Sequence, residues 1–412
     1  MTAPTGDQAG AGAGAVPADG ARTGQPGRPA VAFLTWGQVG ARAAEIAVSL
    51  DGESWGFRPR RLDTRWLAPT RWLLGAVATV WYLLRRRPRA VIATNPPIWL
   101  GLITRLYAWL AGAVTVLDSH PGGFGAQGDR VAARLQRLHA WLAARVDLVL
   151  VTTPAWVKVV EGWGGRGLVL HEAEPAWSPT PSRPAGEVFH LLFAGVFGLD
   201  EPVAEILEAV RELPNVLLSV TGDPRRAPEG LVENAPVNVR FLGYLNQPSY
   251  IGALADADAV VVLSTEPTSV MRAACDAVWA LRPLLVNDSL ALADAFPDAI
   301  RADCTPDALR TGIKELMDRH ADLRVRADEA RARQAGRWRE QRDALTAVVY
   351  RSGPAGQVDA AASGKILAFG RTRRRAARRA PSGQGPGGHG SDGHRPGRGS
   401  AEAVPMADDQ SA

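Results

Sequence analysis

The sequence is poor in cysteine and has no long apolar run. Only two of its 412 residues are cysteines, Cys275 and Cys304, which is too few for a disulfide framework and typical of a reducing compartment. No stretch of about 18 consecutive apolar residues is present, so we expect no membrane-spanning helix. The N-terminus lacks a basic start followed by an apolar segment, so we expect no secretory signal and a cytoplasmic protein.

Several motifs of catalysis and metal binding are also missing. There is no C-x-x-C pair and the seven histidines are scattered, so we expect no metal site. Asp256 and Asp258 mimic a metal-binding D-x-D, but they directly precede an apolar strand and we interpret them as structural. The absence of G-x-x-x-x-G-K-[ST] excludes a P-loop kinase, and the first strand lacks the G-x-G-x-x-G of a dehydrogenase.

The net charge of +5 is concentrated at one end of the chain. Residues 351–412 carry ten basic groups and five acids, which leaves residues 30–350 with 35 groups of each sign. A neutral central part argues against a general nucleic-acid binder. Residues 1–29 and 351–412 have few groups to bury, so we expect disordered tails. The basic cluster 371–379 is either a solvated tail or a contact for anionic lipid or nucleic acid.

Between these ends, apolar strands alternate with helical patterns. A first series has strands expected at 31–35, 56–62, 90–94, 113–117 and 148–152. The proline-rich segment 174–184 predicts a linker. A second series has strands expected at 189–195, 216–221, 237–242, 259–263 and 284–287. The pattern predicts an α/β protein with two doubly wound, Rossmann-like domains at 30–180 and 186–336, which face each other across a cleft, and a helix at 337–350 that crosses back to the first domain.

The most informative stretch runs from strand 259–263 through a polar loop into a helix. A helix that begins at the carboxyl end of a parallel strand offers free N–H groups and a positive dipole end to phosphate. Asp276, over two turns into the expected helix, is placed to reach a sugar hydroxyl of a nucleotide. Thr268 and Ser269, which have the side chains of natural N-cap residues, are candidate contacts for the donor, with capping of the helix as the alternative. Arg272 precedes Asp276 by four residues, which predicts either a phosphate contact or an intrahelical salt bridge.

A second candidate site follows the strand at 113–117. Asp118 and His120 join a carboxylate and an imidazole in a glycine-rich loop at the end of that strand. Either group can accept a proton from an acceptor hydroxyl, and His120 is otherwise an ordinary hydrogen-bonded loop histidine. Gly37 and Gly40 make a turn after the first strand, which is only weak evidence for an acceptor loop.

These segments, in this order and spacing, resemble a GT-B glycosyltransferase of the family 4 type. The resemblance covers most of residues 30–350 and rests on N-P-P at 95–97, L-D-S-H at 117–120, F-A-G at 193–195, V-T-G-D at 220–223, V-R-F-L-G-Y at 239–244 and A-D-A-D-A-V-V-V-L-S at 255–264. It implies a nucleotide-sugar donor in the C-terminal domain and an acceptor in the N-terminal domain. It also implies retention of the anomeric configuration, no metal, and no cofactor besides the nucleotide-sugar co-substrate.

The family carries two glutamates eight residues apart before a G-K-P-V segment, and this motif is degenerate here. Alignment on Arg282 places Asp276 at the second glutamate and Thr268 at the first. The resemblance implies that Asp276 holds the ribose hydroxyls, with a solvent-facing helix acid as the alternative. Glu266 is the candidate replacement for the first glutamate, unless it is ordinary loop chemistry.

Two further residues are candidate contacts for the donor phosphates. Gly195 permits close approach of the backbone, with a tight turn as the alternative. Arg225 follows the turn at Gly222, with loop solubility as the alternative.

Residues 65–67 and 71–87 combine tryptophan, aliphatic residues and a basic end. They predict either an interfacial helix on a membrane or a core helix with a basic C-terminus. The interfacial alternative suits a lipid-linked acceptor and a place at the inner face of the cell membrane.

The leading hypothesis is transfer of a sugar from a nucleotide-sugar donor to a hydroxyl of a sugar, lipid-linked or small-molecule acceptor, as in cell-envelope or exopolysaccharide assembly, without a specific nucleic-acid partner. The alternatives are a catalytically degraded GT-B-like scaffold and a GT-B sugar-nucleotide epimerase.

Overall fold

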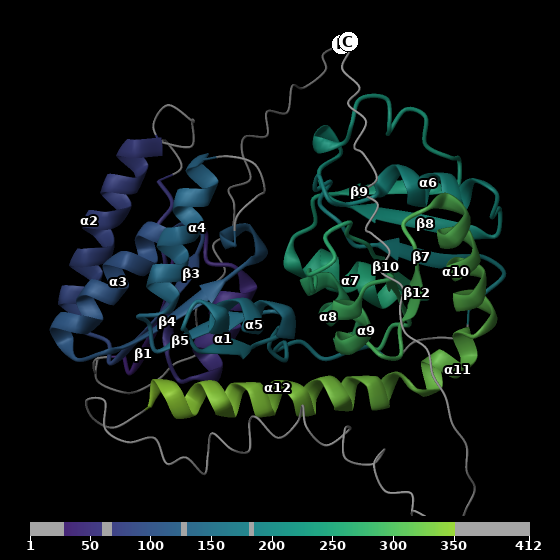
Figure 1. Ribbon diagram of the computed structural model, residues 1–412. Coiled ribbons are helices and arrows are strands. Elements are labelled where there is room, and N and C mark those ends of the chain that lie inside the picture. The colour runs from purple at the N-terminus through teal and green to yellow at the C-terminus, as the bar shows by residue number, and fades with distance from the viewer. Residues whose placement is uncertain (1–28, 60–67, 125–129, 181–184, 351–412) are drawn as a thin grey trace, which may run out of the picture. The chain divides into compact units, whose positions relative to one another are not determined.

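Runs of β-branched and other apolar residues form two sheets, each with six parallel strands. The computed structural model describes residues 29–59, 68–124, 130–180 and 185–350, which lie within one compact unit, Met1–Ser352. Figure 1 shows both sheets with helices on their faces. Strands such as β10 (Ala259–Val262) are continuous apolar runs because helices cover both faces of a parallel sheet.

The first sheet has the strand order β2-β1-β3-β4-β5-β6, so the direction of winding changes between β1 and β3. Its strands are β1 (Val31–Thr35), β2 (Glu53–Gly56), β3 (Ala90–Asn95), β4 (Val114–Ser119), β5 (Leu148–Val151) and β6 (Gly167–Val169). Its helices are α1 (Ala41–Ser49), α2 (Ala68–Arg86), α3 (Ile98–Ala111), α4 (Arg130–Ala143) and α5 (Pro154–Gly162). Ligands of doubly wound sheets bind beyond the carboxyl ends of the strands at such a switch point.

The second sheet has the order β12-β11-β10-β7-β8-β9, and its switch point lies between β7 and β10. Its strands are β7 (Phe189–Phe193), β8 (Val216–Thr221), β9 (Val239–Gly243), β10, β11 (Leu284–Asn287) and β12 (Ile300–Ala302). Its helices are α6 (Val203–Arg211), α7 (Gln247–Asp256), α8 (Arg272–Trp279), α9 (Leu290–Ala295), α10 (Pro306–Asp318) and α11 (His320–Val325). The loop before α8 therefore starts at the switch point.

Two layers of helices enclose the first sheet. Helices α2 to α5 cover one face, where they bury Tyr82, Leu100, Leu142 and Val160. Helix α1 covers the other face together with the last helix, α12 (Ala327–Val349), whose Trp338 and Leu345 join the core of this sheet. Helix α12 also contacts α8 of the second sheet, and Figure 1 shows it running past elements of both sheets.

The predicted α/β class with two doubly wound sheets is confirmed, but three strands differ from the prediction. The strand expected at 56–62 lies at Glu53–Gly56, and the short strands β6 and β12 were not predicted. Both missed strands have three residues, which is too short for a hydrophobic pattern to stand out. The domain boundaries stay predictions, and the expected tails and residues 65–67 lie outside the described residues.

None of the described helices combines the length and the apolar character needed to cross a membrane.

Candidate active site

A cavity of about 490 Å³ brings residues from the carboxyl ends of both sheets together. Gln38 and Gly40, from the loop after β1, line it on one side. Tyr244, Tyr250, Arg272 and Asp276 are among the residues that line it from the second sheet. The volume is within the range of about 300–1,000 Å³ typical of small-ligand sites.

Asp276 is a buried carboxyl group in the wall of this cavity. Only 5% of the residue is exposed, so the solvent-facing alternative is wrong. Burial raises the pKa of Asp276 to about 7, and the nearby carboxylates of Glu172 and Glu45 add to the rise, whereas Arg272 and a hydrogen bond with Tyr250 oppose it. The raised pKa moves the titration of Asp276 towards neutral pH.

Helix α8 begins later than the sequence pattern indicates. Its first residue is Arg272 and its N-cap is Met271, whose side chain makes no capping hydrogen bond. The expectation that Thr268 and Ser269 cap the helix is wrong, and Asp276 lies about one turn into the helix instead of over two. The Thr268 hydroxyl instead donates a 2.7 Å hydrogen bond to Oε1 of Glu266, so it stabilises the loop.

Arg272 joins α8 to carboxylates from the first sheet's side of the cavity. Its guanidinium donates to both oxygens of Glu45 at 3.0 and 3.1 Å and to Glu172 Oε2 at 2.9 Å. The predicted intrahelical salt bridge is also present, with Nε 3.5 Å from Asp276 Oδ2. A phosphate contact by Arg272 would require these carboxylates to be exchanged for the ligand.

Arg42 of α1 holds the predicted acid of the first sheet. Its guanidinium donates to both oxygens of Asp118 at 3.0 and 3.2 Å and to Glu172 Oε1 at 3.0 Å. Burial alone would raise the pKa of Asp118, but the Arg42 cation holds that pKa well below its usual range, with His120 adding to the effect. Because Asp118 stays ionised, it is a weak proton acceptor, and it holds Arg42 and His120 in place.

His120 lies beside Asp118 and keeps contact with solvent. Its Nε2 is 3.3 Å from Asp118 Oδ2, and 40% of its side chain is exposed. The hydrogen bond to Asp118 raises the pKa of His120 above 6.5, although burial opposes the rise. Of the two residues, His120 is thus the better proton acceptor.

These contacts connect the two predicted sites into one network. Asp118 binds Arg42, Arg42 binds Glu172, Glu172 binds Arg272, and Arg272 binds Asp276. Helix α12 contacts the neighbours of two members of this network, because Gln334 donates to Cys275 O, next to Asp276, and Gln341 accepts from His171 N, next to Glu172. The cluster of Arg42, Glu45, Asp118, Glu172, Arg272 and Asp276 is called the ion network below.

The remaining predicted phosphate contacts lie in two loops of the second sheet. The loop after Gly195 aims the N–H groups of Val196 and Gly198 at the carboxylate of Glu201, at 2.9 to 3.1 Å. The Glu201 carboxylate therefore accepts the backbone hydrogen bonds that a phosphate would otherwise accept. Gly195 itself donates to the Thr221 hydroxyl at 3.0 Å.

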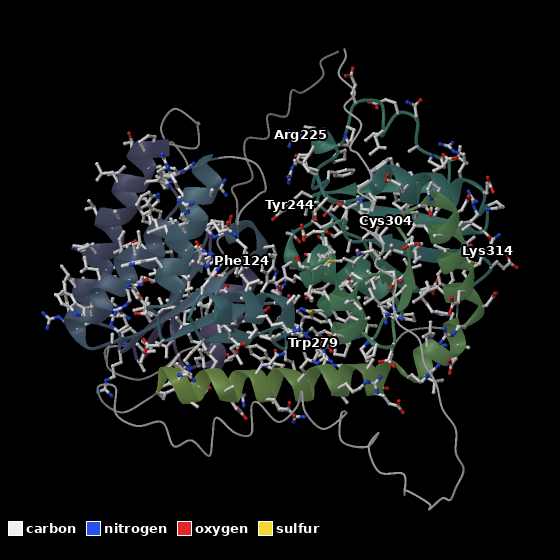
Figure 2. All side chains as sticks on the ribbon, viewed as in Figure 1. Phe124, Arg225, Tyr244, Trp279, Cys304 and Lys314 are labelled. Atoms are coloured by element: carbon white, nitrogen blue, oxygen red, sulfur yellow. The ribbon has the colours of Figure 1, made fainter. Side chains whose placement is uncertain are left out.

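Arg225 and Glu266 are the most exposed of the predicted site residues. The Arg225 side chain is 89% exposed and pairs with Asp223 at 2.7 Å. Figure 2 shows Arg225 at the edge of the second sheet's part of the molecule, beyond Tyr244. Glu266 is exposed in the loop between β10 and α8. Neither lines the cavity that contains Asp276.

Within the described ranges, no three His, Cys, Asp or Glu side chains gather in a way that could hold a metal ion.

Comparison with known proteins identifies the fold. No family model and no curated protein sequence matches the chain. Sucrose-phosphate synthase of Thermosynechococcus elongatus superposes with a TM-score of 0.61 at 14% identity, over 82% of this chain and 99% of that one. HepE of Anabaena, solved in complex with UDP-glucose, superposes with a TM-score of 0.57 at 15% identity, over 77% of this chain and 99% of that one. A putative UDP-N-acetylglucosamine 2-epimerase of Listeria monocytogenes superposes with a TM-score of 0.51 at 12% identity, over 84% of this chain and 96% of that one.

At these identities the likeness concerns the fold alone. The two doubly wound sheets of this chain form a GT-B-like fold, as the sequence motifs predicted.

Proposed function

We propose that this protein is a glycosyltransferase that moves a sugar from a nucleotide-sugar donor to an acceptor hydroxyl. The observation that carries the proposal is the position of Asp276, which is buried in the wall of a cavity at the switch point of the second sheet. Doubly wound sheets bind nucleotides at this place. The proposal includes a metal-independent reaction that retains the anomeric configuration, as the family resemblance implies.

On the donor side, the Asp276 carboxylate would accept hydrogen bonds from the ribose hydroxyls. The ionised carboxylate is the stronger acceptor, and its pKa is raised to about 7. Donor affinity should therefore increase as pH rises from 6 to 8. Arg272, at the start of α8, would turn from Glu45 and Glu172 to the diphosphate, where negative charge develops as the bond to the sugar breaks.

On the acceptor side, His120 would contact the hydroxyl that attacks the sugar. Asp118 fixes the imidazole through Nε2 and is itself fixed by Arg42. The raised pKa of His120 means that its neutral form, which can accept a proton, appears at higher pH than in an unperturbed histidine. Acceptor hydroxyls of a sugar or of a lipid-linked molecule fit this role, and the expected place of action is cell-envelope or exopolysaccharide assembly.

The change His120→Gln should slow transfer without weakening donor binding. Loss of a positioned proton acceptor lowers rates by about 10²- to 10⁴-fold. Initial rates with a donor and acceptor pair, together with the donor-induced rise in melting temperature, separate the two effects. The matched control is His190→Gln, since His190 is an exposed histidine of β7 outside the cavity. A His120→Gln rate within about threefold of the control would remove His120 from the reaction.

A screen of UDP-, GDP- and dTDP-sugars by thermal shift tests the proposed activity, followed by assay of nucleotide release. A ligand present at 100 times its Kd stabilises the folded state by about 2.7 kcal/mol, which is readily seen as a higher melting temperature. The expected result is a higher melting temperature with one nucleotide class and slow release of nucleotide from the matching sugar donor. No shift and no release across the three classes would refute the proposed activity.

A degraded, non-catalytic scaffold is the second candidate, and the internal neutralisation of the site favours it. The predicted anion-binding groups are already satisfied: Glu201 occupies the loop after Gly195, and carboxylates surround Arg272. Thr268 also replaces the first motif glutamate. A scaffold would bind a partner transferase and give no nucleotide release by itself.

A sugar-nucleotide epimerase is the third candidate. The similarity to the Listeria protein, a putative UDP-N-acetylglucosamine 2-epimerase, supports it. An epimerase would convert its sugar nucleotide without any acceptor. Product analysis by NMR distinguishes a new sugar epimer from a transferred sugar.

A further inference from the structure

Helices α2 and α3 expose a stripe of large apolar side chains on the surface away from the first sheet. Leu73, Val77, Trp81 and Leu84 of α2 are between 60% and 65% exposed. Their spacing of three and four residues places them on one side of the helix. On α3, Trp109 and Leu110 are 69% and 71% exposed. These six residues define the outer face.

The outer face lies on two helices that pack against each other. Helix α3 packs against α2 on one side and α4 on the other, and Figure 1 shows α2 and α3 side by side. The opposite sides of the helices are fixed to the sheet, for example by Tyr82, Leu83 and Leu100. Scattered exposed apolar residues are normal on soluble proteins, whereas a stripe along two adjacent helices marks an interaction site.

The charged residues within α2, α3 and α4 have one sign. Helices α2, α3 and α4 contain seven arginines and no aspartate or glutamate. One of these arginines, Arg86, pairs with Glu53 of β2. The guanidinium of Arg85 lies 5.5 Å from the ring centre of Trp81, so the two side chains of α2 form a cation–π pair. Tryptophan beside arginine at the edge of an apolar stripe suits the interface between lipid headgroups and acyl chains.

We propose that the outer face docks the protein onto an anionic lipid bilayer. The apolar stripe would enter the headgroup region while the surrounding arginines contact acidic headgroups. A second copy of the chain fits less well, because pairing two such faces would oppose positive charges. The inference does not depend on the transferase proposal, since lipid binding is measured without any sugar donor.

The position of the outer face has a consequence for the proposed acceptor. A cavity of about 390 Å³ lined by Trp36, Phe57 and Trp72 lies at the carboxyl edge of the first sheet, where α2 and α3 begin. A membrane along the first half of α2, where Leu73 and Val77 lie, would be near the edge of the sheet that carries Asp118 and His120, whereas Trp109 and Leu110 lie at the far end of α3.

Co-sedimentation of the full chain with vesicles tests the docking surface. The probes are vesicles of phosphatidylcholine alone and of phosphatidylcholine with 30% phosphatidylglycerol (about 7:3 by mole). We expect binding to the anionic vesicles, weakening as salt is raised, and at least about tenfold weaker binding to the neutral ones. The double variant Trp81→Glu with Leu84→Glu should weaken binding to anionic vesicles by about tenfold or more.

The matched control is the double variant Val237→Glu with Leu290→Glu. It replaces two apolar residues next to or in elements of the second sheet's part of the chain, which are 107% and 91% exposed. It adds the same charge and should bind like the wild type. Melting curves confirm that both variants are folded, and a second pair, Trp109→Glu with Leu110→Glu, repeats the test on α3. The proposal is overturned if the outer-face variants bind anionic vesicles as well as the control does. It is also overturned if the wild type does not bind the vesicles and light scattering shows that it is a dimer, which these variants dissociate.

Discussion

The variant Arg42→Met is expected to lower the free energy of unfolding by about 3–5 kcal/mol, because the buried carboxylate of Asp118 loses its arginine and Glu172 keeps only one of its two, Arg272. Asp118 and Glu172 both lose a contact of 3.0 Å, and their side chains are only 3% and 11% exposed. Methionine keeps most of the volume, so the loss reports charge and hydrogen bonding more than packing. For a protein of this size the melting temperature should fall by roughly 10 °C.

The cost of Arg42→Met should depend on pH. In the wild type, Arg42 holds the pKa of Asp118 below its usual 3.8, so this pair stabilises the protein above pH 3.8 and the stabilisation is lost as pH falls further. In the variant, burial raises the pKa of Asp118, and the charged form becomes the unfavourable one. The difference in stability between wild type and variant is therefore largest at pH 7 and narrows towards pH 4.

Urea unfolding at pH 7 and pH 5 measures both effects. The matched control is Arg211→Met, which removes an exposed arginine paired with Glu208, 48% and 49% exposed. Such a pair contributes about 0–1 kcal/mol. Equal losses for the two variants would mean that the ion network adds no more stability than a surface pair.

The change Asp276→Asn is expected to weaken donor binding about 10- to 100-fold. Hydrogen bonds to a charged group contribute about 1.5–3 kcal/mol, and each 1.4 kcal/mol is a factor of ten in affinity. Donor titration calorimetry at pH 8 measures the change. The control Asp318→Asn alters an exposed acid of α10 that does not line the cavity. Unchanged donor affinity in Asp276→Asn would exclude Asp276 from ribose binding.

The same variant should be more stable than the wild type at high pH. The pKa of Asp276 is raised from 3.8 to about 7, so the folded state binds a proton more tightly than the unfolded state. Stability then decreases as pH rises from about 4 to 7, and the asparagine variant escapes this loss. The expected gain at pH 8 is on the order of 2–4 kcal/mol. This opposite response of binding and stability distinguishes a functional acid from a structural one.

The placement of Asp118 and Asp276 beyond the carboxyl ends of strands could be predicted from the sequence, because local pattern decides it. The strand 259–263, the polar loop and the helix with Asp276 follow one another along the chain, as do strand 113–117 and Asp118. Carboxyl ends of parallel strands meet at one edge, so the pattern was enough to place both acids at the cavity side.

The ion network could not be predicted in the same way. Arg272 and Glu45 are separated by 227 positions, and Arg42 and Glu172 by 130. Neither Glu45 nor Glu172 belongs to a recognised motif, and only the fold brings them to Arg272. The only available signal was the placement of Arg42 and Glu45 directly after the glycine turn at Gly37 and Gly40, where α1 starts.

The start of α8 was misplaced for a local reason. Thr268 and Ser269 have the side chains of good N-caps, but the loop uses its polar groups otherwise. Thr268 binds Glu266 within a turn at Pro267 and Thr268, and Met271, directly before the helix, is extended. Short polar side chains can stabilise turns as well as helix ends, and the residue type alone does not distinguish the two.

A crystal structure of the protein with the nucleotide sugar selected by thermal shift tests the central claim most directly. The account predicts the nucleotide in the cavity between the two sheets, with a ribose oxygen about 2.5–3.2 Å from a carboxylate oxygen of Asp276. A nucleotide bound at another place, or a cavity that stays empty at saturating donor while Asp276 keeps its contact with Arg272, would contradict it.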